Sequence, residues 1–288
     1  MSRGPAPVAD DDRAPPDLRT RHGLHALLWD VDGTLAETER DGHRVAFNQA
    51  FEALGLPWRW DEVRYGELLA VTGGRERLLA DMAMRADAPP TAGEREALAR
   101  ELHARKNRFY ATLVGDGAIP LRPGVAALMA GCRAVGLRMA ITTTTSRANV
   151  DALLRVHLGP GWREAFAAVV CGEDVQRKKP DPEVFQRALG QLAIGPLQAL
   201  AIEDSPGGLA AARAAGVPVV FTRSAYFAEA PVDNAIAIGP GLHTRAGWLP
   251  PPRGADGPVT LEDLRGWHAA MAFVSQFPGP AAGVGADA

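Results

Sequence analysis

Short apolar runs alternate with longer amphipathic stretches through most of the chain. Five runs are apolar almost without interruption, as expected of β-strands that are covered on both faces. They occupy residues 25–29, 137–142, 166–171, 199–203 and 217–222. Helical patterns precede or separate the last four runs, at residues 124–136, 147–158, 182–192 and 207–216. This alternation predicts right-handed crossovers and a parallel sheet with helices on both faces.

The interval between the first and second runs departs from this alternation. It spans about a hundred residues of helical pattern and holds no strand-like run. Its helical stretches cover residues 43–55, 61–71, 74–86 and 91–114. We therefore predict an α/β fold in which a Rossmann-like parallel sheet core carries an inserted all-helical cap domain.

The domain boundaries follow from these patterns. We expect the core at residues 24–36 and 119–270 and the cap at 37–118, with hinge strands at 35–39 and 115–124. The first residues are rich in Pro, Asp and Arg and the last in Pro, Gly and Ala. Such compositions are typical of disorder, so residues 1–23 are expected to form a disordered leader and 271–288 a flexible tail.

Composition and charge narrow the class of protein. With 288 residues, 47% of them hydrophobic, the chain can bury a sizeable core. A net charge of −3 gives no reason to expect nucleic acid or an anionic membrane as a partner. No apolar run approaches the roughly 20 residues of a membrane span. Cys132 and Cys171 are far apart and no signal segment is evident, which favours a cytoplasmic protein with reduced thiols. The oligomeric state is not defined, and a monomer is favoured.

Polar side chains follow the carboxyl ends of four predicted strands, where ligands bind in an open parallel sheet. They are Asp30 and Asp32 after the first run, Thr143 and Thr144 after the second, Lys179 beyond the third, and Glu203 and Asp204 at the end of the fourth. Each motif alone has an ordinary interpretation as a turn, a helix cap or a solvated charge pair. Their coincidence on one rim favours a catalytic site.

In this order, Asp30-Val31-Asp32-Gly33-Thr34, Thr143, Lys179-Pro180 and Glu203-Asp204-Ser205 resemble the four motifs of the haloacid dehalogenase (HAD) superfamily. The helical insert after the first motif is similar to the C1-type cap of its phosphoglycolate phosphatase and β-phosphoglucomutase relatives. The likeness covers roughly residues 25 to 225 and implies a phosphatase that works through an aspartyl-phosphate.

The residue types suit phosphoryl transfer, which needs a nucleophile, charge neutralisation and a proton for the leaving oxygen. Asp30 is the candidate nucleophile and Asp32 the candidate acid and base. Glu203 and Asp204 offer hard oxygen ligands for Mg²⁺, together with Asp30. The resemblance implies that Asp32 adds its backbone carbonyl to these metal ligands. Lys179 supplies a positive charge, and Thr143 a hydroxyl beside the Thr144 amide.

Further stretches resemble the CbbY branch of this superfamily, at residues 35–51, 58–78, 117–129, 141–154 and 171–185. That resemblance implies hydrolysis of xylulose-1,5-bisphosphate, a small phosphorylated sugar, in an organism that runs the Calvin cycle. It also implies that Glu39, Tyr65 and the loop Thr72 to Arg77 bind the substrate, and this loop contains Thr72, Gly73, Gly74, Arg75 and Arg77.

Several assignments in the cap stay open at this stage. Arg75 and Arg77 can each bind phosphate oxygens, and Arg75 is preferred because it directly follows the glycine pair. Tyr65 is equally consistent with the core of the cap, and His43 with either packing or a place behind the catalytic residues. The alternatives to a bisphosphatase are a broad sugar-phosphate or phosphoglycolate phosphatase, a phosphomutase, and a non-catalytic phosphosugar-binding regulator.

Overall fold

A six-stranded parallel sheet forms the centre of the molecule in the computed structural model, which describes residues 23–254 and 256–276. The strand order is β3-β2-β1-β4-β5-β6. The strands are β1 (Ala26–Trp29), β2 (Arg138–Thr142), β3 (Ala168–Val170), β4 (Ala199–Glu203), β5 (Val219–Thr222) and β6 (Ala237–Gly239). The predicted α/β fold is confirmed. Each of the five apolar runs contains one strand, and β6 is an additional strand at the edge of the sheet.

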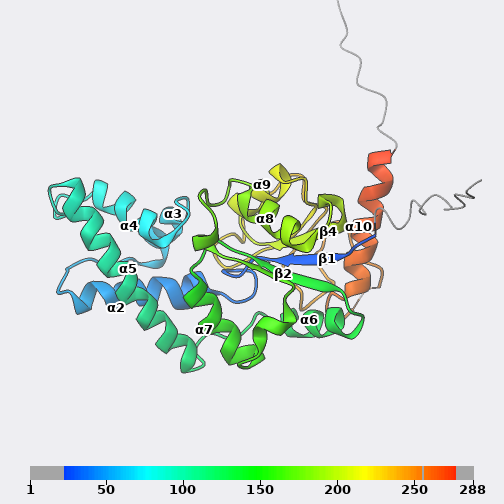
Figure 1. Cartoon of the computed structure of the whole chain (residues 1–288), viewed down its shortest axis with the longest axis horizontal. Helices are drawn as coiled ribbons and strands as arrows, with labels where there is room; N and C mark the ends of the chain where they lie inside the picture. Colours follow the sequence, from blue (N-terminus) through cyan, green and yellow to red (C-terminus); the bar gives the residue numbers. More distant parts are fainter. Residues whose placement is uncertain (1–22, 255, 277–288) are drawn as a thin grey trace, which may run out of the picture.

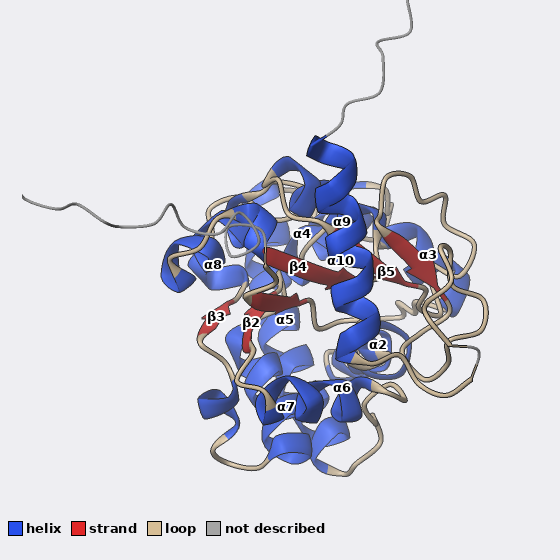
Figure 2. Cartoon of the chain, turned by 90° about the vertical axis from the view of Figure 1, so that its right-hand side faces the viewer, coloured by secondary structure: helices blue, strands red, loops and turns tan. Residues whose placement is uncertain are grey.

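Helices cover both faces of this sheet (Figure 2). Leu27 and Trp29 of β1 face one apolar cluster, to which α6 (Val125–Ala134), α7 (Arg147–Leu158) and α10 (Leu261–Gln276) contribute. Leu28 faces the other cluster with α8 (Glu183–Leu192) and α9 (Pro206–Ala214). Strands buried on both faces need apolar residues at successive positions, which explains the continuous runs in the sequence. Short helical turns lie at Glu39–His43, Trp162–Ala165, Gly172–Asp174 and Pro196–Gln198.

The segment between β1 and α6 is helical (Figure 1). It comprises α2 (Arg44–Ala53), α3 (Glu62–Leu68), α4 (Gly74–Ala83) and α5 (Ala92–Gly115). These helices share an apolar cluster of their own, built around Phe47, Phe51 and Trp60. Helix α5 belongs to both parts, because Leu102 packs in the cap cluster while Tyr110 and Val114 pack in the core cluster.

The two segments that join cap and core lie side by side. Ala36 and Leu121 form a single antiparallel bridge, and the Arg122 amide donates to the Leu35 carbonyl at 2.7 Å. The guanidinium of Arg122 also lies 3.3 Å from a Glu37 carboxylate oxygen and 2.5 Å from the Gly33 carbonyl oxygen. Pairing is thus limited to one bridge, where two hinge strands were predicted.

The chain ends bear on two further predictions. The predicted leader lies outside the described residues except for residue 23, and so does most of the predicted tail. Residues 271–276, which were assigned to the tail, belong to α10 (Leu261–Gln276). No helix in the described part of the chain is both long and apolar enough to cross a membrane.

Candidate active site

The carboxyl ends of β1 and β4 bring three buried carboxylates together. Asp30 follows β1, Glu203 is the last residue of β4, and Asp204 comes next. One carboxylate oxygen from each of the three lies within 4.8 Å of the corresponding oxygens of the other two. Two glycines leave room for them, because a Cβ atom at Gly33 would lie 2.0 Å from an Asp204 oxygen and one at Gly208 1.9 Å from a Glu203 oxygen.

Lys179 reaches this cluster from the loop between β3 and α8. Its ammonium donates to Asp30 Oδ1 at 2.7 Å and to Glu203 Oε1 at 2.5 Å. Burial disfavours the charged form of Lys179, but the two carboxylates outweigh it and hold its pKa above the usual range. Burial raises the pKa of Glu203 to about 8, although Lys179 opposes the shift, and raises the pKa of Asp204 well above its usual value. One ammonium therefore compensates three acids incompletely, which favours binding of a further cation.

The donor set fits a hard divalent cation such as Mg²⁺, which prefers carboxylate and carbonyl oxygens. Glu203 Oε2 is buried and has no hydrogen-bond partner among the described residues. Asp204 Oδ1 lies 3.4 Å from Thr34 Oγ1, and the side chain of Ser224 also hydrogen-bonds to Asp204. Glu203 Oε2 can thus bind a cation without losing a hydrogen bond.

The side chain of Asp32 turns away from the carboxylate cluster. Its Oδ1 accepts a hydrogen bond from Thr38 Oγ1 at 2.6 Å and lies 2.9 Å from His43 Nε2. Burial works against ionisation, but the charge and hydrogen bond of His43 and the hydrogen bond of Thr38 lower the pKa of Asp32 to about 2. The side chain is therefore free for proton transfer, and only the backbone carbonyl of Asp32 stays a candidate metal ligand. His43 lies behind a catalytic candidate rather than serving only to pack the cap.

Thr143 and Thr144 lie on the loop between β2 and α7. The Thr143 amide donates to the Val170 carbonyl, and its buried hydroxyl accepts from the Thr145 amide at 3.2 Å. This arrangement leaves the hydroxyl proton of Thr143 available to a ligand. Ser146 caps the helix that follows, since its side chain accepts from the Asn149 amide.

A cavity of about 580 Å³ lies between these residues and the cap. Most of the predicted site residues line it: Asp30, Asp32, Glu39, Thr72, Gly73, Gly74, Arg77, Thr143, Thr144 and Lys179. Glu203 and Asp204 are buried and are not among its lining residues. Tyr65 and Arg75 are not among its lining residues.

The structure places Arg75 and Arg77 differently, and only Arg77 lies where a ligand in the cavity could reach it. Arg75 is exposed and pairs with Glu96 of α5 at 3.2 Å. Arg77 is buried, lines the cavity, and donates to the Tyr65 hydroxyl oxygen at 2.7 Å. Arg75 was preferred because it directly follows the glycine pair. However, α4 begins at Gly74, and Arg75 in its first turn does not line the cavity.

Tyr65 does not line the cavity but contacts two residues that do, Glu39 and Arg77. It is fully buried, its hydroxyl donates to Glu39 Oε2 at 2.5 Å, and its ring packs against Phe47 and Trp60. Glu39 also lies 3.5 Å from Arg77 Nη1. The Tyr65 hydroxyl thus joins Glu39 and Arg77, both of which line the cavity.

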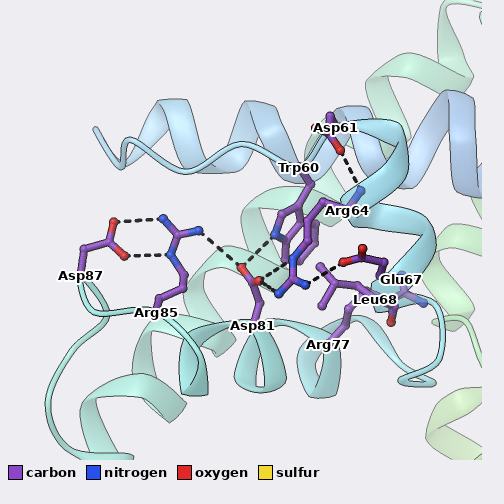
Figure 3. A network of polar contacts seen from close by, with 9 residues as sticks. All are labelled: Trp60, Asp61, Arg64, Glu67, Leu68, Arg77, Asp81, Arg85 and Asp87. Carbon is purple, nitrogen blue, oxygen red and sulfur yellow. Dashed lines mark hydrogen bonds and ion pairs between the residues drawn. The ribbon is translucent and has the colours of Figure 1, made fainter.

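A network of polar contacts fixes α3 against α4 (Figure 3). The buried carboxylate of Asp81 accepts from Trp60 Nε1 at 2.9 Å and from Arg64 Nη2 at 2.6 Å. Arg77 Nε donates to the Leu68 carbonyl at the end of α3 at 3.2 Å. The orientation of Arg77 therefore depends on how α3 and α4 pack.

Three further basic residues line the cavity, and sequence reasoning did not assign them to it: His103, Lys106 and Lys178. The Lys106 ammonium lies 5.3 Å from the Phe47 ring centroid and 5.1 Å from that of Tyr110. Burial lowers the pKa of Lys106 to about 8. The signal for Lys106 was its four-residue spacing from Leu102 and Tyr110, which places a lysine on the buried face of α5.

Comparison with known proteins gives an independent view of this site. A family model of haloacid dehalogenase-like hydrolases matches residues 24–216. The plasmid protein CbbY of Cupriavidus necator is 43% identical over 247 residues, covering 85% of this chain and 97% of the relative. CbbY of Rhodobacter capsulatus is 45% identical over 203 residues, covering 70% and 87%.

A solved structure shows the same similarity in three dimensions. It is that of a CbbY variant from Rhodobacter sphaeroides in complex with xylulose-1,5-bisphosphate, which superimposes with a TM-score of 0.69 at 40% identity. The match covers 74% of this chain and 92% of that one. The predicted resemblance to the CbbY branch is confirmed. The chain belongs to the haloacid dehalogenase-like hydrolase family and is a phosphatase similar to the CbbY proteins.

Proposed function

We propose that the protein is a Mg²⁺-dependent phosphatase that hydrolyses a small sugar bisphosphate, with xylulose-1,5-bisphosphate as its preferred substrate. The observation that carries this proposal is that catalytic candidates line the cavity on the core side and further basic side chains line it on the cap side. Asp30 and Lys179 lie at its core end, whereas Arg77, His103 and Lys106 line it on the side of the cap. The similar structure with bound xylulose-1,5-bisphosphate supports the same substrate class.

Asp30, Glu203, Asp204 and the backbone carbonyl of Asp32 would hold the Mg²⁺ ion. When bound, the ion supplies positive charge that lets a carboxylate approach an anionic phosphate. This assignment rests on the burial of the three clustered carboxylates and on the unpartnered oxygen of Glu203.

Asp30 begins the reaction. One of its carboxylate oxygens attacks phosphorus, the bond from phosphorus to the ester oxygen breaks, and an aspartyl-phosphate forms. Lys179 holds Asp30 in place through its 2.7 Å contact and adds charge that stabilises the transferring group. The Thr143 hydroxyl and the Thr144 amide donate hydrogen bonds to the phosphoryl oxygens.

Asp32 moves the proton in both steps. The carboxyl of Asp32 is ionised in the free enzyme because His43 and Thr38 stabilise the charge. The arriving phosphate adds negative charge nearby, which raises the pKa of Asp32 and favours its protonation. Asp32 then protonates the leaving oxygen, and as a carboxylate it takes a proton from the water that attacks the aspartyl-phosphate. Inorganic phosphate leaves and Asp30 is restored.

The cap selects the substrate. A bisphosphate has a second anionic group that the core site does not use, and Arg77 and Lys106 offer cations for it. Glu39 lies between the two ends and can accept hydrogen bonds from sugar hydroxyls. A monophosphate such as phosphoglycolate would leave the cap cations without a partner and should bind more weakly.

Phosphate release from a panel of substrates tests this function. The panel contains xylulose-1,5-bisphosphate, xylulose 5-phosphate, phosphoglycolate and β-glucose 1-phosphate, each with Mg²⁺ and with excess chelator. We expect the highest kcat/KM for the bisphosphate and no turnover with chelator. Equal kcat/KM across the panel would refute the bisphosphate assignment. Accumulation of glucose 6-phosphate from β-glucose 1-phosphate would show a phosphomutase instead.

A further inference from the structure

An ion pair connects cap and core at the cavity. Lys178, on the core loop that carries Lys179, places its ammonium 2.7 Å from Glu76 Oε1 in the first turn of α4. The two residues are 102 positions apart in the sequence. The pair therefore depends on the position of the cap over the core.

The loop before α4 wraps closely around this pair. A Cβ atom at Gly73 would lie 2.3 Å from Glu76 Oε2 and 2.6 Å from the Lys178 ammonium. Gly73 also has φ +101°, a conformation that side chains rarely adopt. The position of Thr72, Gly73 and Gly74, which all line the cavity, is thus tied to the geometry of the ion pair.

On the core side the pair adjoins the catalytic lysine. Lys178 directly precedes Lys179, which bonds Asp30 and Glu203. A shift of Lys178 would therefore be transmitted through one peptide unit to the residue that holds the nucleophile. The ion pair between Glu76 and Lys178 is thus connected to the cap loop through Glu76 and to Asp30 through Lys179.

The pair has intermediate exposure. The Lys178 side chain is 26% exposed and that of Glu76 38% exposed. Fully exposed pairs contribute little to stability, and fully buried pairs are costly to break. A half-buried pair can close the cap and still open in each catalytic cycle.

We propose that Glu76 and Lys178 are positioning residues whose ion pair holds the cap closed over the substrate and sets the loops of Gly73 and Lys179. This inference deepens the proposed function and rests on it for its catalytic meaning. When the pair is broken, a smaller fraction of molecules has the closed geometry, and the apparent affinity for substrate falls by that fraction. KM should therefore rise by about tenfold while kcat changes less than threefold.

Charge reversal provides the test. Glu76→Lys and Lys178→Glu are made singly and together in the full chain, with Glu76→Gln as a milder variant in case a reversal impairs folding. Kinetics are measured with p-nitrophenyl phosphate, a generic phosphate monoester, in Mg²⁺. Each single reversal should raise KM, and the double variant should restore it. A matched control is Glu101→Gln, which removes an exposed pair with Arg105 on α5 and should leave both constants unchanged.

A second readout follows the cap directly. Spin labels at Met84→Cys in the cap and Val135→Cys in the core, both exposed positions, report the distance between the two parts without substrate. The native cysteines are buried and should not be labelled. Each single reversal should broaden and lengthen the distance distribution, and the double variant should restore it.

The outcomes separate this inference from the proposed function. Unchanged distances in the single reversals would overturn it, and so would a double variant whose distance is restored but whose KM stays high, because Lys178 would then bind the substrate directly. A panel without preference for the bisphosphate would refute the proposed substrate but leave the distance measurements valid.

Discussion

Arg77 and Arg75 provide a comparison of two arginines on one helix. Arg77 donates to the Tyr65 hydroxyl oxygen at 2.7 Å and to the Leu68 carbonyl at 3.2 Å, and its side chain is 6% exposed. The Arg75 side chain is 46% exposed. Methionine keeps an unbranched apolar stem and removes the guanidinium and its charge, so Arg77→Met and Arg75→Met are the same change in different surroundings.

The magnitudes differ because the surroundings do. Removing one partner of a buried ion pair costs about 3–5 kcal/mol, and we expect the lower end for Arg77→Met because the Glu39 side chain is 19% exposed. An exposed ion pair contributes about 0–1 kcal/mol to stability. Arg75→Met should therefore change the free energy of unfolding by no more than about 1 kcal/mol. If Arg77 also donates to a substrate phosphate, its loss should lower kcat/KM roughly 10- to 150-fold.

Two assays on each variant test this reasoning. Urea unfolding gives the change in the free energy of unfolding, and phosphate release from xylulose-1,5-bisphosphate gives kcat/KM. The account requires a large effect on both quantities at Arg77 and a small one at Arg75. If Arg75→Met lowered kcat/KM as much as Arg77→Met does, the assignment of Arg77 as the cap cation would be refuted.

Three further changes have defined outcomes. Gly208→Ala should lower kcat at least tenfold at fixed Mg²⁺, because the new Cβ would lie 1.9 Å from a Glu203 oxygen. This loss is expected even though alanine stabilises a helix by about 1 kcal/mol relative to glycine. An unchanged kcat would show that this oxygen is dispensable. The kcat/KM of the wild type should fall above about pH 8, where Lys106 loses its proton and its attraction for the anionic substrate, and Lys106→Met should lack this decline in a pH profile. Asp81→Asn removes the charge that Arg64 contacts at 2.6 Å and should lower the free energy of unfolding in urea by about 1–3 kcal/mol, whereas no change would show that the network in Figure 3 contributes little to stability.

The central sheet could be predicted because the burial of its strands is visible in short segments of the sequence. Strands buried on both faces need uninterrupted apolar residues, and each such run became a strand. Strand β6, Ala237–Gly239, was not predicted, because its apolar run covers only residues 235–238 and ends at a Gly-Pro pair that is typical of a turn. The catalytic candidates of the core could be predicted for a related reason, since strand ends in a parallel sheet meet at one edge.

The basic lining where cap and core meet at the cavity could be predicted only in part. Lys178 looked like half of a solvated pair with Lys179, and its partner Glu76 lies 102 residues away. Lys106 faces the cavity because α5 packs against α2 and along α7, which no local pattern specifies. Contacts between distant helices depend on packing angles, and these follow from the whole fold rather than from the spacing of residues in one segment.

The central claim is that Asp30 attacks phosphorus. The most direct measurement is the steady-state rate of phosphate release from xylulose-1,5-bisphosphate by the wild type and by Asp30→Asn, side by side in Mg²⁺, with far-ultraviolet circular dichroism to confirm that both are folded. The account predicts rapid release by the wild type and a loss of at least about 10³-fold in the folded variant, because the amide is a poor nucleophile. Phosphate release by folded Asp30→Asn at a rate near that of the wild type would contradict it.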